Sequence, residues 1–381
     1  HPAIFRKILR QVEALDPDFI VSMGDLVEDG GDFQQWEDFY FRPAAQVINH
    51  IPLISTLGDH EGDGDRGELF RYFFLKKEDV DSQWFAFRYG NTHFVSLDYR
   101  HPADNKMIDW YRQELIPDNA RWKFVFMHRP CFNLGGHRAY WGQPLWPKLF
   151  RDNRVDMVFA GHSHQYERFF PMRPAGQPDS WPVTYITTGG AGAGLYEINP
   201  HPDVEKSAVV HHFIYIRVHR NTLQYTVYDT SGSEIDHLKI LKKQGRYAAD
   251  YLKTVQAQEK VDLMTMFACA ISNSLRQVPQ TDRPALYELQ LRPVAGEDVS
   301  FEISLTGESG EAYRMEPFRG VLRGRKVLRK SVPIFSKMKV QVGKWGDMKP
   351  ELRLQAKFKS SFGENELTGG AIEYWPEEKN Q

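Results

Sequence analysis

The 381-residue chain is predicted to open with an α/β layered fold and to continue with a mostly-β region. Up to about residue 242, short apolar runs alternate with helix-like segments, as they do around sheets of parallel strands. Four of these apolar runs end directly at Asp or His residues. From residue 285 onward, apolar and polar residues alternate with a period of two between glycine-containing turns, which is typical of a small β-sandwich.

The first element is a helix over residues 1–15, because Ile4, Ile8, Leu9 and Val12 recur at helical spacing. Gly90-Asn91 is a turn signal that joins two strands into a hairpin. Further helices are expected over residues 33–48 and 106–115. Segments expected to hold the strands are 18–25, 51–61, 84–90, 91–99, 122–130, 155–164, 183–190, 211–220 and 223–235.

Three regions are expected along the chain. Residues 1–245 form the α/β domain, residues 246–284 a helix and a linker, and residues 285–381 the β-sandwich-like domain of unknown role. Residues 311–360 carry 14 Lys or Arg against 4 acids. This excess is either a solvated basic face or a surface for an anionic lipid, polymer or partner.

Overall composition excludes little. The chain is 41% hydrophobic and 26% charged with a net charge of −2, so whole-chain charge gives no argument for nucleic acid or membrane. No apolar run reaches the roughly 18 residues of a transmembrane helix. The two cysteines, Cys131 and Cys269, are too few for a disulfide framework.

The acids and histidines at the strand ends are the candidate site. In open α/β sheets, ligands bind outside the carboxyl ends of the strands, so residues at these ends can converge on one point. His162 and His164 are two residues apart, and alternate residues of an extended strand point to the same side. The candidates are Asp25, Asp59, His60, His128, His162 and His164.

Mixed carboxylate and imidazole ligands suit Zn, Mn or Fe, whereas calcium prefers oxygen ligands alone. The acidic stretch 57–65 is therefore not expected to be a calcium loop. Its twelfth position, counted from Asp59, is Phe70 where a calcium loop needs Glu.

Residues 1–242 resemble the calcineurin-like metallophosphoesterases and, within them, the purple-acid-phosphatase-like branch. The resemblance implies a four-layer β-sandwich flanked by helices, and it rests on short blocks in the expected order. These blocks are Gly24-Asp25, Gly58-Asp59-His60-Glu61, His128 in FVFMHRP and Gly161-His162-Ser163-His164.

The resemblance also implies a metal-dependent phosphoric ester hydrolase with two ions of Fe, Mn or Zn. Asp25 would bridge the ions, Asp59, His128 and His162 would complete one of them, and His164 would serve the other. A metal-activated hydroxide would attack a phosphomonoester or phosphodiester.

Three further residues are expected to take part in catalysis. His60 would stabilise the transferring group or protonate the leaving oxygen. Glu61 either orients His60 or faces solvent. His137, on the glycine-rich loop 135–138, either contacts phosphate or is an ordinary surface residue.

The chain departs from the family pattern at three points. The first metal block of the family belongs upstream of the first helix, so either a preceding segment exists or the protein holds one metal well and the other poorly. Glu28 stands where the purple enzymes carry their tyrosine, so their coloured iron–tyrosinate centre is not expected. Asp59 replaces an asparagine, which adds a negative charge that would weaken the attraction of phosphate.

Phosphomonoesterase or phosphodiesterase activity is the leading hypothesis. The alternative is a degenerate member that binds phosphorylated ligands or partners with little catalysis, and scaffolding through the basic C-terminal domain is compatible with either. The expected partner is a phosphate ester, and nucleic acid is expected only as a phosphodiester substrate. Because the branch is commonly exported, a periplasmic or secreted location is favoured over a cytoplasmic one.

Overall fold

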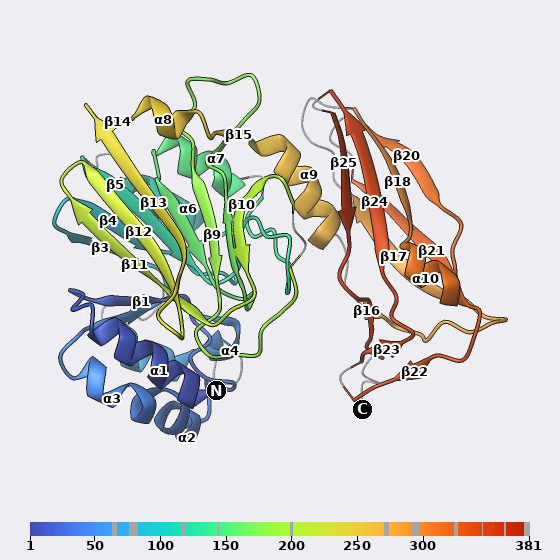
Figure 1. Cartoon of the computed structure of the whole chain (residues 1–381), viewed down its shortest axis with the longest axis horizontal. Coiled ribbons are helices and arrows are strands. Elements are labelled where there is room, and N and C mark those ends of the chain that lie inside the picture. The colour runs from blue at the N-terminus through green and yellow to red at the C-terminus, as the bar shows by residue number, and fades with distance from the viewer. Residues whose placement is uncertain are drawn as a thin grey trace. The chain divides into compact units, whose positions relative to one another are not determined.

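The computed structural model describes residues 1–62, 67–75, 83–115, 119–143, 145–198, 201–269, 274–291, 298–323, 327–344, 346–361 and 363–376. The chain divides into two compact units, His1–Gln258 and Glu259–Gln381. Each unit is described by itself below (Figure 1).

A seven-stranded sheet forms the centre of the first unit (Figure 1). Its middle strands are parallel and largely buried, which explains their continuous apolar sequences. The strand order is β10 (Val204–Ala208), β7 (Tyr166–Phe169), β9 (Thr184–Thr188), β6 (Met157–Ala160), β5 (Trp122–Met127), β4 (Thr92–Ser96) and β3 (Phe85–Tyr89).

Two smaller sheets supply the second half of the sandwich. One pairs β1 (Ile20–Ser22) with β2 (Leu53–Ser55) in parallel, and the other is an antiparallel sheet. Side chains of both halves meet in one buried core that includes Phe126, Phe159 and Tyr225. The antiparallel sheet comprises β11 (His212–His219), β12 (Thr222–Asp229), β13 (Glu234–Lys243) and β14 (Arg246–Tyr247).

Helices complete the layers. Leu9 of α1 (Pro2–Glu13) and Val47 of α3 (Arg42–Ile48) share a buried cluster with Ile20 of β1. The helices α6 (Asn105–Leu115) and α7 (Leu145–Asp152) connect parallel strands and contact each other through Tyr111 and Trp146. The predicted fold class is therefore confirmed: an α/β β-sandwich with flanking helices, followed by a β-rich region.

Two predicted helices differ in detail. The helix expected over residues 33–48 is built from α2 (Phe33–Gln35), a π-helical segment η1 (Trp36–Phe41) and α3. The helix expected within residues 246–284 is broken into α8 (Ala249–Leu252) and α9 (Gln258–Cys269). Between these two helices, β15 (Gln256–Ala257) leaves the helical path to pair with β8 (Met172–Arg173).

The second unit contains two antiparallel sheets, and apolar side chains alternate inward along its strands. One sheet has the order β17 (Ala285–Leu291), β21 (Leu328–Ser336), β19 (Tyr313–Arg314). The other has the order β20 (Phe318–Leu322), β18 (Val299–Leu305), β24 (Leu354–Ser360), β25 (Gly363–Thr368). Phe267 of α9 packs edge-on against Phe358 of β24, so this helix contacts the strands of its own unit. The remaining described elements are α4 (Asp59–Gly62), α5 (Glu68–Phe74), α10 (Gly307–Ala312), β16 (Ser274–Leu275), β22 (Gln341–Val342), β23 (Met348–Lys349) and β26 (Glu373–Tyr374).

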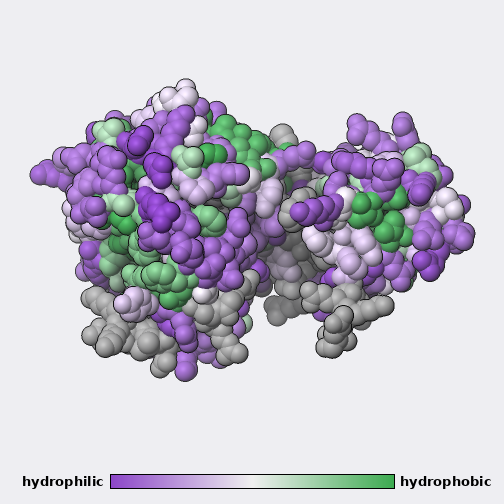
Figure 2. Space-filling view, turned by 90° about the horizontal axis from the view of Figure 1, so that it is seen from below, coloured by the Kyte–Doolittle hydropathy of each residue, from purple (hydrophilic) through white to green (hydrophobic). Residues whose placement is uncertain are grey.

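The molecular surface is polar on the face shown in Figure 2, where apolar residues occur in separate areas. Large apolar side chains are concentrated in the cores instead. Among the described residues, no helix has both the length and the apolar character to cross a membrane.

His212 makes the stability of the first unit sensitive to acid. It is 1% exposed, its Nδ1 donates to Val210 O at 2.9 Å, and its Nε2 accepts from Thr188 Oγ1 at 2.9 Å. Burial lowers the pKa of His212 to about 4. Unfolded histidine binds a proton below about pH 6.5, so the free energy of unfolding falls as pH drops from about 6.5 to 4, by about 3 kcal/mol.

Urea unfolding of the wild type and of His212→Gln at pH 7 and pH 4.5 tests this expectation. The variant loses less stability between the two pH values than the wild type does. His219→Gln, at the exposed end of the same strand, serves as control and keeps the wild-type pH dependence. Equal pH dependence in the wild type and His212→Gln would show that His212 is not responsible.

Candidate metal centre

The loops that follow β1 and β2 touch through their backbones. Gly24 has φ +84°, and a Cβ atom there would lie 2.5 Å from Gly58 N. A Cβ atom on Gly58 would lie 2.2 Å from Asp25 N. Only glycine fits at both points, so the positions of Asp25 and Asp59 are fixed relative to each other.

Glu61 joins the same two loops from within. Its Oε2 accepts hydrogen bonds from Asp25 N and Gly58 N, both at 2.8 Å, and its Oε1 accepts from Leu26 N and from Val27 N at 3.4 Å. Its side chain is 0% exposed, so the expectation that it faces solvent is wrong. These bonds go to backbone N–H groups rather than to His60, so Glu61 orients the loop of Asp25.

The environment of Glu61 contains opposing effects. Burial and the nearby charge of Asp25 raise the pKa of Glu61 to about 7, although the backbone N–H groups of Asp25 and Leu26 favour the carboxylate. Without the buried Glu61 carboxyl group, several backbone N–H donors would lack hydrogen-bond partners.

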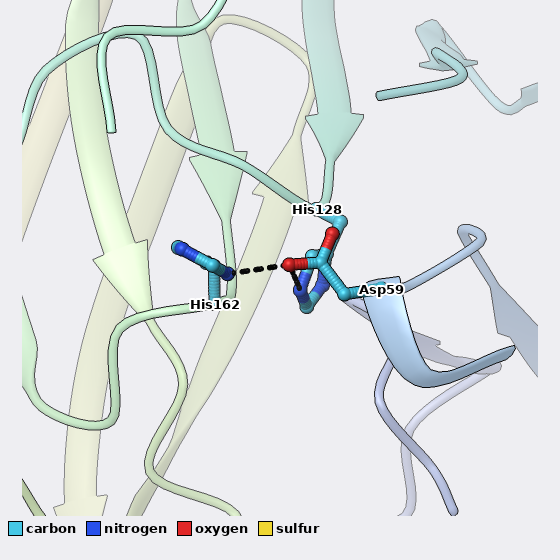
Figure 3. Close-up of side chains that lie close together, drawn as sticks. All are labelled: Asp59, His128 and His162. Carbon is cyan, nitrogen blue, oxygen red and sulfur yellow. Dashed lines mark ion pairs between the residues drawn. The ribbon is translucent and has the colours of Figure 1, made fainter. Parts of the chain in front are cut away.

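Asp59, His128 and His162 come together at the ends of three strands. Each offers a ligand atom, and these atoms all lie within 4.8 Å of one another. Figure 3 shows Asp59 between the two imidazoles, with its Oδ2 at 3.0 Å from His162 Nδ1 and 3.9 Å from His128 Nε2. Asp25 adjoins this cluster, since its Oδ2 lies 3.1 Å from His128 Nε2.

His128 is the most deeply placed of these residues. Its side chain is 0% exposed, and its Nδ1 donates to Met23 O at 2.8 Å. Its buried Nε2 makes no hydrogen bond within the part of the chain that the structure describes. An imidazole oriented through one nitrogen, with the other beside two carboxylates, fits a transition-metal ion.

Charges in the cluster also fit a cation. Burial alone would raise the pKa of Asp25, but the His128 imidazole beside it holds that pKa below its usual value. Burial is likewise outweighed at Asp59, whose pKa is lowered by His162 and Arg129. Burial lowers the pKa of His162. At neutral pH the acids are anionic and His162 is neutral, which are the forms that bind metals. At His128, burial is outweighed by the two acids, which raise its pKa, so a cation would take the place of a proton there.

Two residues of this region have strained backbones. Asp25 has φ 57° and His162 has φ 64°, in the left-handed region that residues with a Cβ atom rarely adopt. Such strain persists where surrounding structure fixes the conformation, and it concentrates at functional sites. Both residues are ones that the sequence predicts as metal ligands.

His164 lies outside the cluster of three. Its Nδ1 donates to Gly194 O at 2.8 Å, and its ring stacks on Tyr196 with centroids 4.4 Å apart. His137 also stacks on Tyr196, at 4.6 Å, and its centroid lies 5.4 Å from that of His162. His137 is exposed at the surface, as one of the two alternatives expected, yet desolvation by the surrounding protein and the neighbouring His162 and His164 lower its pKa to about 4.

His60 lies beside the cluster on the first turn of α4, and it is exposed. Its backbone N donates to Asp25 Oδ1 at 3.0 Å, and its Nδ1 donates to the Glu28 carbonyl at 2.9 Å. The carbonyl fixes the tautomer and the orientation of the ring, which leaves Nε2 for other partners.

Two residues of this region have no role in the sequence-based hypothesis. Tyr196 stacks between His137 and His164. Arg129 binds both carboxylate oxygens of Asp59. Arg129 lies inside the quoted motif FVFMHRP, directly after His128, so this cation next to a strand-end histidine was the available signal.

Comparisons with known proteins agree with this geometry. The calcineurin-like phosphoesterase family matches residues 1–166. "Purple acid phosphatase 17" of Arabidopsis thaliana is 26% identical over 273 residues, covering 61% of this chain and 77% of that protein. "Phosphoenolpyruvate phosphatase" of Allium cepa is 26% identical over 184 residues, covering 41% of this chain and 38% of that protein.

Among solved structures, the purple acid phosphatase PPD1 from yellow lupin (Lupinus luteus) seeds has a similar fold. The TM-score is 0.56 at 18% sequence identity, and the match covers 64% of this chain and 49% of that one. The relatives and the fold thus indicate a phosphoric ester hydrolase, and the strand-end cluster offers a candidate set of metal ligands. Residues 1–166 thus resemble the calcineurin-like phosphoesterase family, and the similar proteins include members of its purple-acid-phosphatase branch.

Proposed function

We propose that the strand-end site hydrolyses phosphate esters with two transition-metal ions of Fe, Mn or Zn. Asp25 would bridge the ions, Asp59, His128 and His162 would hold one of them, and His164 would serve the other. The convergence of Asp59, His128 and His162 from three strand ends is the observation that carries this proposal.

When bound, the ions would polarise the phosphoryl group and activate water. The chain itself would supply the orientation of the ester and the proton. His60 is held by the Glu28 carbonyl through Nδ1, which would orient the ring so that Nε2 faces a phosphoryl or leaving oxygen. His137, neutral and stacked on Tyr196, would donate a hydrogen bond to phosphate without adding charge.

Metal analysis combined with turnover assays tests the proposal. We expect bound transition metal, turnover of para-nitrophenyl phosphate or of bis(para-nitrophenyl) phosphate, and loss of turnover after chelation that Zn, Mn or Fe reverses. The ratio of the two rates decides between a monoesterase and a diesterase. A protein with neither metal nor turnover would be a phosphate-binding relative instead.

The anionic partner and the exported location stay predictions. Several basic side chains of the second unit are already paired within it, such as Arg319 with Glu302 at 2.8 Å and Lys359 with Glu364 at 2.7 Å. Part of the basic excess over residues 311–360 is therefore balanced locally.

A further inference from the structure

Asp59 is paired with a cation at the edge of the cluster. Arg129 Nε lies 2.9 Å from Asp59 Oδ1 and 3.1 Å from Oδ2, and Arg129 Nη2 lies 3.0 Å from Oδ2. A two-pronged contact of this kind fixes the guanidinium in one plane and is stronger than a single ion pair.

The support beneath Arg129 is rigid. Its guanidinium lies over the ring of Tyr99, 5.2 Å from the centroid. Tyr99 is 7% exposed and packs edge-on against His128, with centroids 5.6 Å apart. Arg129 thus packs on Tyr99, which in turn packs on the buried His128 imidazole of the cluster.

One edge of the guanidinium remains available. The Arg129 side chain is 46% exposed, and its Nη1 makes no hydrogen bond to any described residue. An ordinary exposed ion pair contributes little, because water screens it and both side chains lose freedom. This pair differs, since Asp59 is only 17% exposed and its Oδ2 also contacts His162.

A phosphate ester approaching this site meets two carboxylates, Asp25 and Asp59. Both carry negative charge at neutral pH, and like charge repels an anionic substrate. We propose that Arg129 offsets the charge of Asp59 and receives the phosphate group through its free Nη1 edge. This inference rests on the proposed function, in which the ions would attract phosphate, and it assigns Arg129 as the residue that offsets the additional charge of Asp59.

A double-mutant cycle tests the assignment. Wild type, Arg129→Ala, Asp59→Asn and the double variant are loaded with the same metal. Calorimetry then gives the affinity for inorganic phosphate, and steady-state kinetics give KM and kcat for para-nitrophenyl phosphate. Arg129→Ala is expected to weaken phosphate binding and raise KM about tenfold, as loss of a charge-assisted hydrogen bond implies.

The coupling between the two residues is the sharper measurement. In the Asp59→Asn background, loss of Arg129 is expected to cost less phosphate affinity than in the wild type, because its direct contact with phosphate is lost but no carboxylate is left unpaired. Arg129→Lys is expected to keep more phosphate affinity than Arg129→Ala, since lysine keeps the positive charge but cannot make the two-pronged contact. Arg319→Ala removes a comparable two-pronged pair with Glu302 in the second unit and leaves phosphate affinity unchanged.

Two results overturn the inference: an unchanged phosphate affinity in Arg129→Ala, or equal losses in both backgrounds. Phosphate binding without turnover in the wild type would refute the proposed hydrolysis and leave the role of Arg129 intact. Turnover in the wild type, together with a phosphate affinity that does not change in Arg129→Ala, would support the proposed hydrolysis and refute the role of Arg129.

Discussion

Replacement of His128 with alanine is expected to lower turnover about a thousandfold or more and to remove bound metal. The imidazole is fully buried, and its Nδ1 is committed to Met23 O. Its Nε2 is left beside Asp25 and Asp59 without a hydrogen bond from any described residue. Without this nitrogen, a bound ion would lose its most rigid ligand.

Metal content by mass spectrometry and turnover of para-nitrophenyl phosphate measure this effect. His237→Ala is the matched control, because that histidine is 74% exposed and pairs only with Glu234 on its own strand. Circular dichroism checks that the variant folds, since Met23 O loses its donor. Folded His128→Ala with full metal content and normal turnover would contradict the proposed ligand set.

Replacement of Glu61 with glutamine is expected to cost about a hundredfold in activity or metal affinity, although Glu61 itself touches no proposed ion. Both oxygens of Glu61 accept backbone N–H groups of the two metal loops. Glutamine has nearly the same shape, but its NH2 group would face one of these donors. Asp25 would then lose the support that holds its strained backbone in place.

The Glu61→Gln variant distinguishes a role in positioning the metal loops from a role in the overall stability of the fold. The experiment compares metal affinity, turnover and the free energy of unfolding in Glu61→Gln. Glu234→Gln, an exposed substitution of the same chemistry, is the control. Loss of metal affinity in a protein that is still folded supports a positioning role, whereas wild-type affinity would refute it.

Much of the fold was predictable because the hydrophobic pattern of short sequence segments indicates the strands and helices. Continuous apolar runs mark the buried parallel strands, and an Asp or His directly after a run marks its carboxyl end. Asp59, His128 and His162 follow this rule, and the structure brings them together. The π-helical turn at Trp36–Phe41 and the break before α9 depend on tertiary packing, so periodicity does not show them.

The contacts that were missed join residues distant in sequence. Arg129 and Asp59 are 70 positions apart, so sequence reasoning left the charge of Asp59 unbalanced, whereas the fold pairs it with Arg129. Glu61 was expected either beside His60 or in solvent, because its hydrogen bonds to Asp25 and Leu26 cross 36 and 35 positions. When a side chain bonds to backbone groups of a distant loop, no residue type or spacing in the sequence indicates the contact.

The backbone contact at Gly24 and Gly58 has a consequence for interpreting mutational scans. Even alanine at either position would place its Cβ atom 2.5 Å or less from the backbone of the other loop and force the loops apart, so both positions should appear as intolerant as the ligands themselves. Neither glycine has a side chain to contribute to catalysis. Intolerance to substitution here would report the spacing between two loops, and libraries that diversify one loop need to vary the other with it.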